Sequence, residues 1–140
     1  MNEEKWIESY DKNFNHNKQQ LSYPELVEQL INDFHINKIN FMGKTGLDDK
    51  SFDRFKKGKI PSLKKLILIC VVFEIDIQSL IGLLRALGRT FNLTDPVHYA
   101  YYKLVEDYKG HNVDECNELL RKIGITENKY LLPDPINGIK

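Results

Sequence analysis

Apolar residues recur along most of this chain at intervals of three or four positions, the spacing of helices that bury one face. Leu26, Val27, Leu30 and Ile31 illustrate the pattern, which returns in later segments. Clear period-two alternation and tight hairpin turns, which would favour strands, are not found in the sequence. The pattern therefore predicts an all-α protein.

Helix start and stop signals divide the apolar pattern into short helices. Ser22 with Glu25, and Asn112 with Glu115, have the spacing of a capping box, in which two side chains satisfy amide donors at a helix start. The remaining start signals are Asn37, Asp48, Pro61-Ser62 and Asp95-Pro96, and the stop signals are Gly46, Gly58, Gly88, Gly110 and Gly124. One segment, Pro61 to Phe73, is apolar nearly all round, so we expect it at the centre of the helical bundle. Its β-branched residues would also suit a strand, and only the neighbouring helices favour a helix there.

The size and charge of the chain narrow the classes of protein it can belong to. At 140 residues it is long enough for one domain with a core, and its 41% hydrophobic and 29% charged residues are ordinary for a soluble globular protein. The net charge of zero hides an uneven distribution: residues 1–37 carry −4, residues 66–140 carry −2, and residues 38–65 carry +6 from nine Lys or Arg and three Asp. This basic segment indicates a localised anionic partner, although a solvated lysine face has the same charge pattern.

Two of the predicted helices lie within the basic segment, on either side of Gly46 and Leu47. The turn between them is too tight for an antiparallel pair, so the helices must cross steeply, as they do in a helix-turn-helix. In the second of them, Phe52 and Phe55 form one narrow apolar stripe, and the other side chains project outward. A helix held along one edge can enter the DNA major groove, which is about 12 Å wide.

Residues 26–80 resemble the Xre/Cro family of phage-repressor-type helix-turn-helix domains. The strongest match is Ser51-Phe-Asp-Arg-Phe-Lys-Lys-Gly58-Lys59, followed by Pro61-Ser62-Leu63 and an apolar helix. Gly46 and Leu47 match the turn glycine and the aliphatic residue that follows it in the family. The resemblance implies a five-helix domain in which the second and third helices read DNA.

The chain departs from the family pattern in three places. Met42 stands where the second helix usually has a small residue, with Gly43 beside it. One loop residue before Pro61 is missing. The third departure is a set of acids in the recognition helix, Asp48, Asp49 and Asp53, which are unfavourable near phosphates.

The resemblance also implies which residues contact DNA. Base edges would be read by Asp49, Lys50 and Arg54, because arginine and lysine donate to guanine and a carboxylate accepts from cytosine. Lys38, at the start of the preceding helix, would meet a phosphate. The full implied set of DNA-binding residues is Lys38, Asp49, Lys50, Ser51, Arg54, Lys57 and Lys59, with Lys57 and Lys59 running along the backbone.

We expect four segments along the chain. Residues 1–20 are an N-terminal helix and a linker, and the helix has Trp6, Ile7, Tyr10 and Phe14 on one face. Residues 21–88 are the helix-turn-helix domain. Residues 89–125 add two further helices, and residues 126–140 are an extended tail. Residues 94–124 are similar to the helical extension of some small regulators of Gram-positive bacteria and their mobile elements, best over Val113 to Arg121. The extension is a candidate dimer surface, because two DNA half-sites need two reading units. Alternatively, its helices complete a single core.

We therefore predict a sequence-specific double-stranded DNA-binding transcriptional regulator, a homodimeric repressor that needs no cofactor and is not an enzyme. The alternative is a module with the same fold that binds a protein, such as an adaptor or an antitoxin-like partner, and has weak or no DNA binding.

Other chemistry finds little support in the sequence. His16, His35 and His98 lack catalytic or ligand spacing, and the cluster from His111 to Cys116 is better explained by helix capping than by a metal site. The two cysteines, Cys70 and Cys116, match no zinc or redox spacing and indicate buried thiols in a reducing cytosol. The acidic N-terminus is unlike a signal peptide, and the longest apolar run, residues 66–73, is too short to span a membrane. We predict a cytoplasmic protein.

Overall fold

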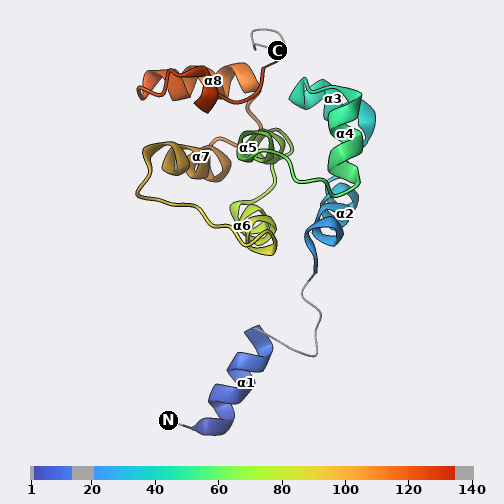
Figure 1. Cartoon of the computed structure of the whole chain (residues 1–140), viewed down its shortest axis with the longest axis vertical. Coiled ribbons are helices and arrows are strands. Elements are labelled where there is room, and N and C mark those ends of the chain that lie inside the picture. The colour runs from blue at the N-terminus through green and yellow to red at the C-terminus, as the bar shows by residue number, and fades with distance from the viewer. Residues whose placement is uncertain (1, 14–20, 135–140) are drawn as a thin grey trace.

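The computed structural model describes residues 2–13 and 21–134, and in these ranges the chain is helical without strands (Figure 1). The all-α prediction is therefore confirmed. The described elements are α1 (Glu3–Asn13), α2 (Tyr23–Asp33), α3 (Lys38–Thr45), α4 (Asp49–Lys56), α5 (Leu63–Val72), α6 (Ile77–Ala86), α7 (Pro96–Asp107), α8 (Val113–Lys122) and the 3-10 turn η1 (Asn128–Tyr130).

Local capping explains why the helices begin where they do. Ser22 and Glu25 form the predicted capping box at α2, and Asn112 and Glu115 form the one at α8. Asn37 caps α3 as expected, and it does so in a further box with Asn40, whose side chain accepts from the Asn37 N–H at 2.7 Å. These bonds satisfy amides that the first helical turn leaves without partners, so each start is determined by two or three neighbouring residues.

Helix α5 lies at the centre of the bundle, as its apolar sequence predicts. All seven residues from Leu66 to Val72 are buried, and α3 and α7 both pack against this helix. Figure 1 shows α5 between α7 on one side and the α3–α4 pair on the other. The Gly110 N–H also donates to the Val71 carbonyl at 2.8 Å, which ties the end of the α7 segment to α5.

The inner faces of α7 and α8 belong to the same hydrophobic core as α2 to α6. Tyr101, Leu104, Cys116 and Leu120 are buried in one cluster with the residues of α5. Ile123 continues the apolar spacing of α8, which would predict that it is buried, but it is 58% exposed. It follows the last residue of α8 as the C-cap, where the chain already turns away from the core.

The predicted extended tail covered residues 126–140, and the part of it that the structure describes, up to residue 134, is not extended throughout; residues 135–140 lie outside the described residues. Residues Asn128–Tyr130 form a 3-10 turn, and Leu131 and Leu132 are buried in the core. The buried Asn117 amide donates to the Leu132 carbonyl at 3.0 Å, and its oxygen accepts from the Leu132 N–H at 2.7 Å. This paired contact replaces the backbone hydrogen bonds that a helix would supply, so two apolar residues outside any helix can be buried.

The predicted N-terminal helix is present as α1, but it adds no residue to the described core. Trp6 and Ile7 are exposed. The Tyr10 side chain and Phe14, which we expected on the same face, lie outside what the structure describes. In the described ranges, none of the helices has the length and apolar character needed to cross a membrane.

Gly58 allows the chain after α4 to pass close to α2. Its φ is +79°, in the left-handed region, and a Cβ at this position would lie 2.7 Å from the Cβ and Cγ of Pro24. Gly88 has a similar φ of +71°, but a Cβ there would meet nothing within 4 Å. Comparing substitutions at the two glycines therefore separates the cost of a left-handed backbone from the cost of close packing against Pro24.

We predict that Gly58→Ala lowers the free energy of unfolding by more than Gly88→Ala does. Both variants meet the backbone cost of about 1 to 2 kcal/mol for a left-handed L-residue, and only Gly58→Ala adds an overpacking cost of about 1 to 3 kcal/mol. Urea unfolding followed by circular dichroism measures both losses. Equal losses would contradict a close contact between Gly58 and Pro24.

We predict that Asn117→Ala destabilises the protein because it removes the hydrogen bonds that hold Leu132 in the core. The substitution leaves the Leu132 N–H and carbonyl without their partner, and each buried orphaned group costs about 1 to 3 kcal/mol. Glu118→Ala is the control, because Glu118 is exposed and makes only a surface ion pair with Lys122 at 3.5 Å. The urea midpoint of Asn117→Ala is expected well below that of Glu118→Ala, and a wild-type midpoint would rule out this anchoring role.

Candidate nucleic-acid interface

A cluster of three phenylalanine rings holds α4 against the body of the protein. Phe52 and Phe55 of α4 are 5% and 3% exposed. Both pack on the fully buried Phe41 of α3, with ring centroids 5.3 Å and 5.8 Å apart. The remaining α4 side chains are exposed or half-buried, so the helix is attached along one side only.

The turn between α3 and α4 is fixed by one buried hydroxyl. The Thr45 hydroxyl donates to the Phe41 carbonyl at 2.6 Å and accepts from the Leu47 N–H at 3.0 Å. Gly46, with φ +73°, is the left-handed C-cap that the sequence predicted. Leu47 is buried, so this short connection sets the direction in which α4 leaves α3.

Asp48 acts at the start of α4 as a cap. Its carboxylate accepts from the Ser51 N–H at 2.8 Å, and this bond holds the pKa of Asp48 below its usual value, with smaller contributions from the charges of Lys65 and Lys50. Part of the negative charge that the sequence places in the basic segment therefore caps the start of the helix.

Asp53 forms an ion pair with Lys38, at 3.3 Å between Nζ and the carboxylate oxygen. The pair joins the first turn of α3 to the middle of α4, and both side chains are 48% exposed. An ion pair this exposed stabilises the fold by roughly 0 to 1 kcal/mol. Its main effect is electrostatic, because the positive charge of Lys38 offsets the negative charge of the Asp53 carboxylate.

The predicted DNA-binding residues lie on α4 and on the segment after it, except Lys38, which lies in the first turn of α3. Lys38, Asp49, Lys50, Arg54, Lys57 and Lys59 are exposed, and Ser51 is half-buried. We call the exposed side chains of α4 and its C-terminal flank, Asp49, Lys50, Arg54, Lys56, Lys57 and Lys59, the α4 surface. Lys38 lies beside this surface through its pair with Asp53.

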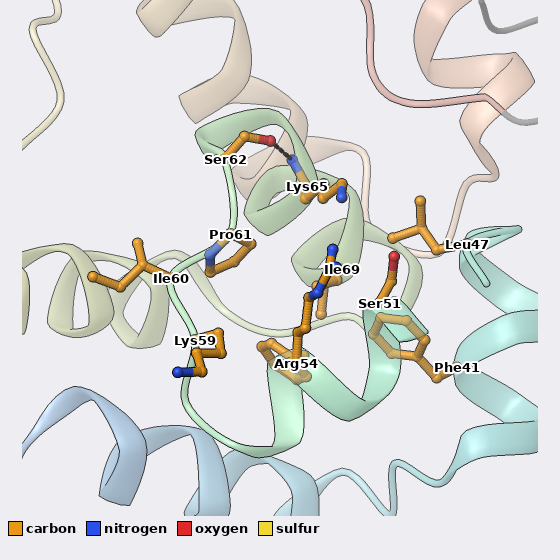
Figure 2. Close-up of a pocket in the computed structure, with 11 residues that line it drawn as sticks. Phe41, Leu47, Ser51, Arg54, Lys59, Ile60, Pro61, Ser62, Lys65 and Ile69 are labelled. Atoms are coloured by element: carbon orange, nitrogen blue, oxygen red, sulfur yellow. Dashed lines mark hydrogen bonds between the residues drawn. The ribbon is translucent and has the colours of Figure 1, made fainter. Parts of the chain in front are cut away.

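Three of the predicted residues also meet in a pocket between α4 and α5 (Figure 2). Ser51, Arg54 and Lys59 line it together with Ser62 and Lys65, and the cavity volume is about 160 Å³. Figure 2 shows the Arg54 side chain extending from α4 toward α5. We call this the cationic pocket. Asp49, Lys50 and Lys57 do not line it.

The DNA-binding residues predicted from the sequence did not include Lys65 and Ser62. Ser62 is the N-cap of α5 and accepts from the Lys65 N–H at 3.3 Å, which brings both residues to the same helix end. The signal available in the sequence was the shortened loop before Pro61, because fewer residues hold the start of α5 closer to α4.

The other candidate cluster, near the start of α8, has local structural contacts. His111 Nδ1 lies 3.3 Å from a carboxylate oxygen of Glu115, and its ring stacks on Tyr108 at a centroid distance of 3.7 Å. In residues 2–13 and 21–134, no three His, Cys, Asp or Glu side chains are grouped to hold a metal ion. Cys70 and Cys116 are free and buried, and burial raises the pKa of the Cys116 thiol to about 12.

No protein-family model, curated protein or solved structure matches this chain. The case for its function therefore rests on the residues of the α4 surface and on the helices that position them.

Proposed function

We propose that this protein is a sequence-specific double-stranded DNA-binding transcriptional regulator, a repressor that reads the major groove with residues 48–57. The observation that carries the proposal is the attachment of α4 by Phe52 and Phe55 along one side, with a mostly basic surface on the other. A helix with its side chains is about 10 to 12 Å across, and the major groove is about 12 Å wide. A helix held in this way is free to enter the groove.

The order and lengths of the helices support the specific fold in this proposal. In it, α2 to α6 are the five helices of a phage-repressor-like domain, and α3 and α4 are its helix-turn-helix. The left-handed Gly46 between α3 and α4 and the packing of α3 on both α4 and α5 support this assignment. The similarity to the Xre/Cro family remains part of the proposal.

In this proposal, the residues of the α4 surface have two kinds of role. Lys50, Arg54 and Asp49 contact base edges: Asp49 and Lys50 lie in the first turn of α4, and Arg54 lies one turn later. Lys57 and Lys59 contact phosphates, together with Lys38, while the Ser51 hydroxyl lies at the inner edge of the surface. Phosphate contacts position the domain, and base contacts give the specificity.

A regulator of this kind acts in the cytoplasm on paired half-sites, so we include a homodimer in the proposal. The inner faces of α7 and α8 are used in the core of one chain, and a dimer would use their outer faces. Tyr99 on α7 and Ile123 after α8 are exposed apolar residues there, at 50% and 58%. Exposed apolar residues of this size are typical of protein contacts.

One observation favours the alternative, a protein-interaction module with weak DNA binding. On α3, Ile39 is 85% exposed and Met42, three positions later, is 38% exposed, so two apolar side chains face outward together. The acids Asp48 and Asp49 at the start of α4 also oppose phosphate binding. This alternative predicts that the outer face of α3 binds a protein.

The two functions differ in how binding depends on salt. If the α4 surface neutralises several phosphates, the affinity for duplex DNA falls steeply between about 50 and 200 mM salt, because bound counterions are released. Fluorescence anisotropy with a labelled duplex pool measures this slope. A flat slope, or no binding at low salt, would favour the protein-interaction module.

Two substitutions test the roles within the proposed surface. We predict that Arg54→Ala weakens a selected site by about 1 to 3 kcal/mol and relaxes one base position. We expect Lys38→Ala to weaken all duplexes alike, because it removes a phosphate contact and leaves the Asp53 carboxylate without its cation. Selection of bound oligonucleotides before and after each substitution measures both effects. Wild-type binding by both variants would show that the site is assigned to the wrong residues.

A further inference from the structure

The cationic pocket collects three positive side chains from three different segments. Arg54 comes from α4, Lys59 from the segment after it, and Lys65 from the first turn of α5. In the part of the chain that the structure describes, none of the three forms an ion pair. Lys65 lowers the pKa of Asp48, so one carboxylate lies near the pocket, but it is a single negative charge against three positive ones. The pocket therefore has an excess of positive charge.

The walls of the pocket strengthen its attraction for an anion. Phe41, Leu47, Phe55 and Ile69 give it an apolar floor, which lowers the local dielectric constant. The N-terminus of the ten-residue α5 opens beside Ser62, and it adds a partial positive charge. The Ser51 and Ser62 hydroxyls supply two further donors.

Size and donor number identify the class of anion. A cavity of about 160 Å³ is close to one that holds a benzene molecule, so a phosphate group fits inside it, and the rest of a larger ligand would lie outside the pocket. Arg54 and Lys65, with Lys59 at the edge of the pocket and two hydroxyls, suit the several oxygens and double charge of a phosphate better than a single carboxylate.

We propose that the cationic pocket binds the phosphate group of a small phosphate monoester, and that occupancy draws Arg54 away from the DNA-reading face of α4. Arg54 is the side chain shared by the pocket and the α4 surface. Since one guanidinium cannot serve both, phosphate in the pocket and DNA on α4 compete, and the competition is reciprocal. The competition depends on the proposed DNA binding, whereas phosphate binding does not.

The first test measures binding of inorganic phosphate to the full chain by calorimetry, in buffers of constant ionic strength with chloride as the reference anion. We expect saturable binding that Lys65→Gln weakens by about tenfold or more, because a charged hydrogen bond is lost. Lys64→Gln is the matched control, since Lys64 is the next residue on α5 and does not line the pocket. We expect a change of less than about twofold for Lys64→Gln, and thermal unfolding of both variants establishes that they fold.

The second test adds duplex DNA. Phosphate is expected to raise the Kd for DNA by more than chloride does at the same ionic strength, and Lys65→Gln should remove the difference. If phosphate binds the wild-type chain and no duplex does, the pocket stands and the proposed DNA function fails. If inorganic phosphate does not bind but Lys65→Gln weakens DNA binding, the pocket holds a backbone phosphate of DNA and the small-ligand proposal is overturned. Equal phosphate binding by Lys64→Gln and Lys65→Gln also overturns it.

Discussion

The packing of Phe52 and Phe55 on Phe41 is the contact on which the rest of this structure depends. Aromatic rings bury a large area, and three of them in contact give a short helix one well-defined attachment. Helix α4 has eight residues, too few to be stable alone, so its existence and its direction come from this cluster. Because the rings occupy one side of α4, the basic side chains are left on the other.

The fold gives some of the charged side chains in the basic segment local partners and leaves others without an ion pair within the described residues. Asp48 is occupied with capping α4, and Asp53 lies beside Lys38, so two of the three acids have local partners. The cations Arg54, Lys59 and Lys65 meet around one cavity without forming an ion pair in the described part of the chain. Of the acids that weaken the case for DNA binding in the sequence, Asp53 is thus offset by a cation, and an excess of positive charge remains between α4 and α5.

The C-terminal helices pack on the side of the core away from the α4 surface. Helix α7 packs on α5, and the Gly110 N–H is bonded to the last turn of α5. Helix α7 therefore covers the central helix on the side opposite α3 and α4 (Figure 1), and the α8 residue Asn117 fixes Leu132 in the same core. Helix α5 carries Lys65 into the cationic pocket, so this support also positions part of the proposed anion site.

The sequence by itself determined the helices and most of their ends, because a cap such as Asn112 with Glu115, or a left-handed residue such as Gly46, acts over three or four neighbouring positions. It also predicted which face of α4 is buried, since the Phe52 and Phe55 spacing is local. Only the tertiary structure decided that Lys38 pairs with Asp53, that Asn117 holds the tail, that Ile123 is exposed, and that Lys65 joins Arg54 in a pocket. These contacts join residues that are distant in the chain or depend on which face a neighbouring helix covers, and no local spacing encodes either.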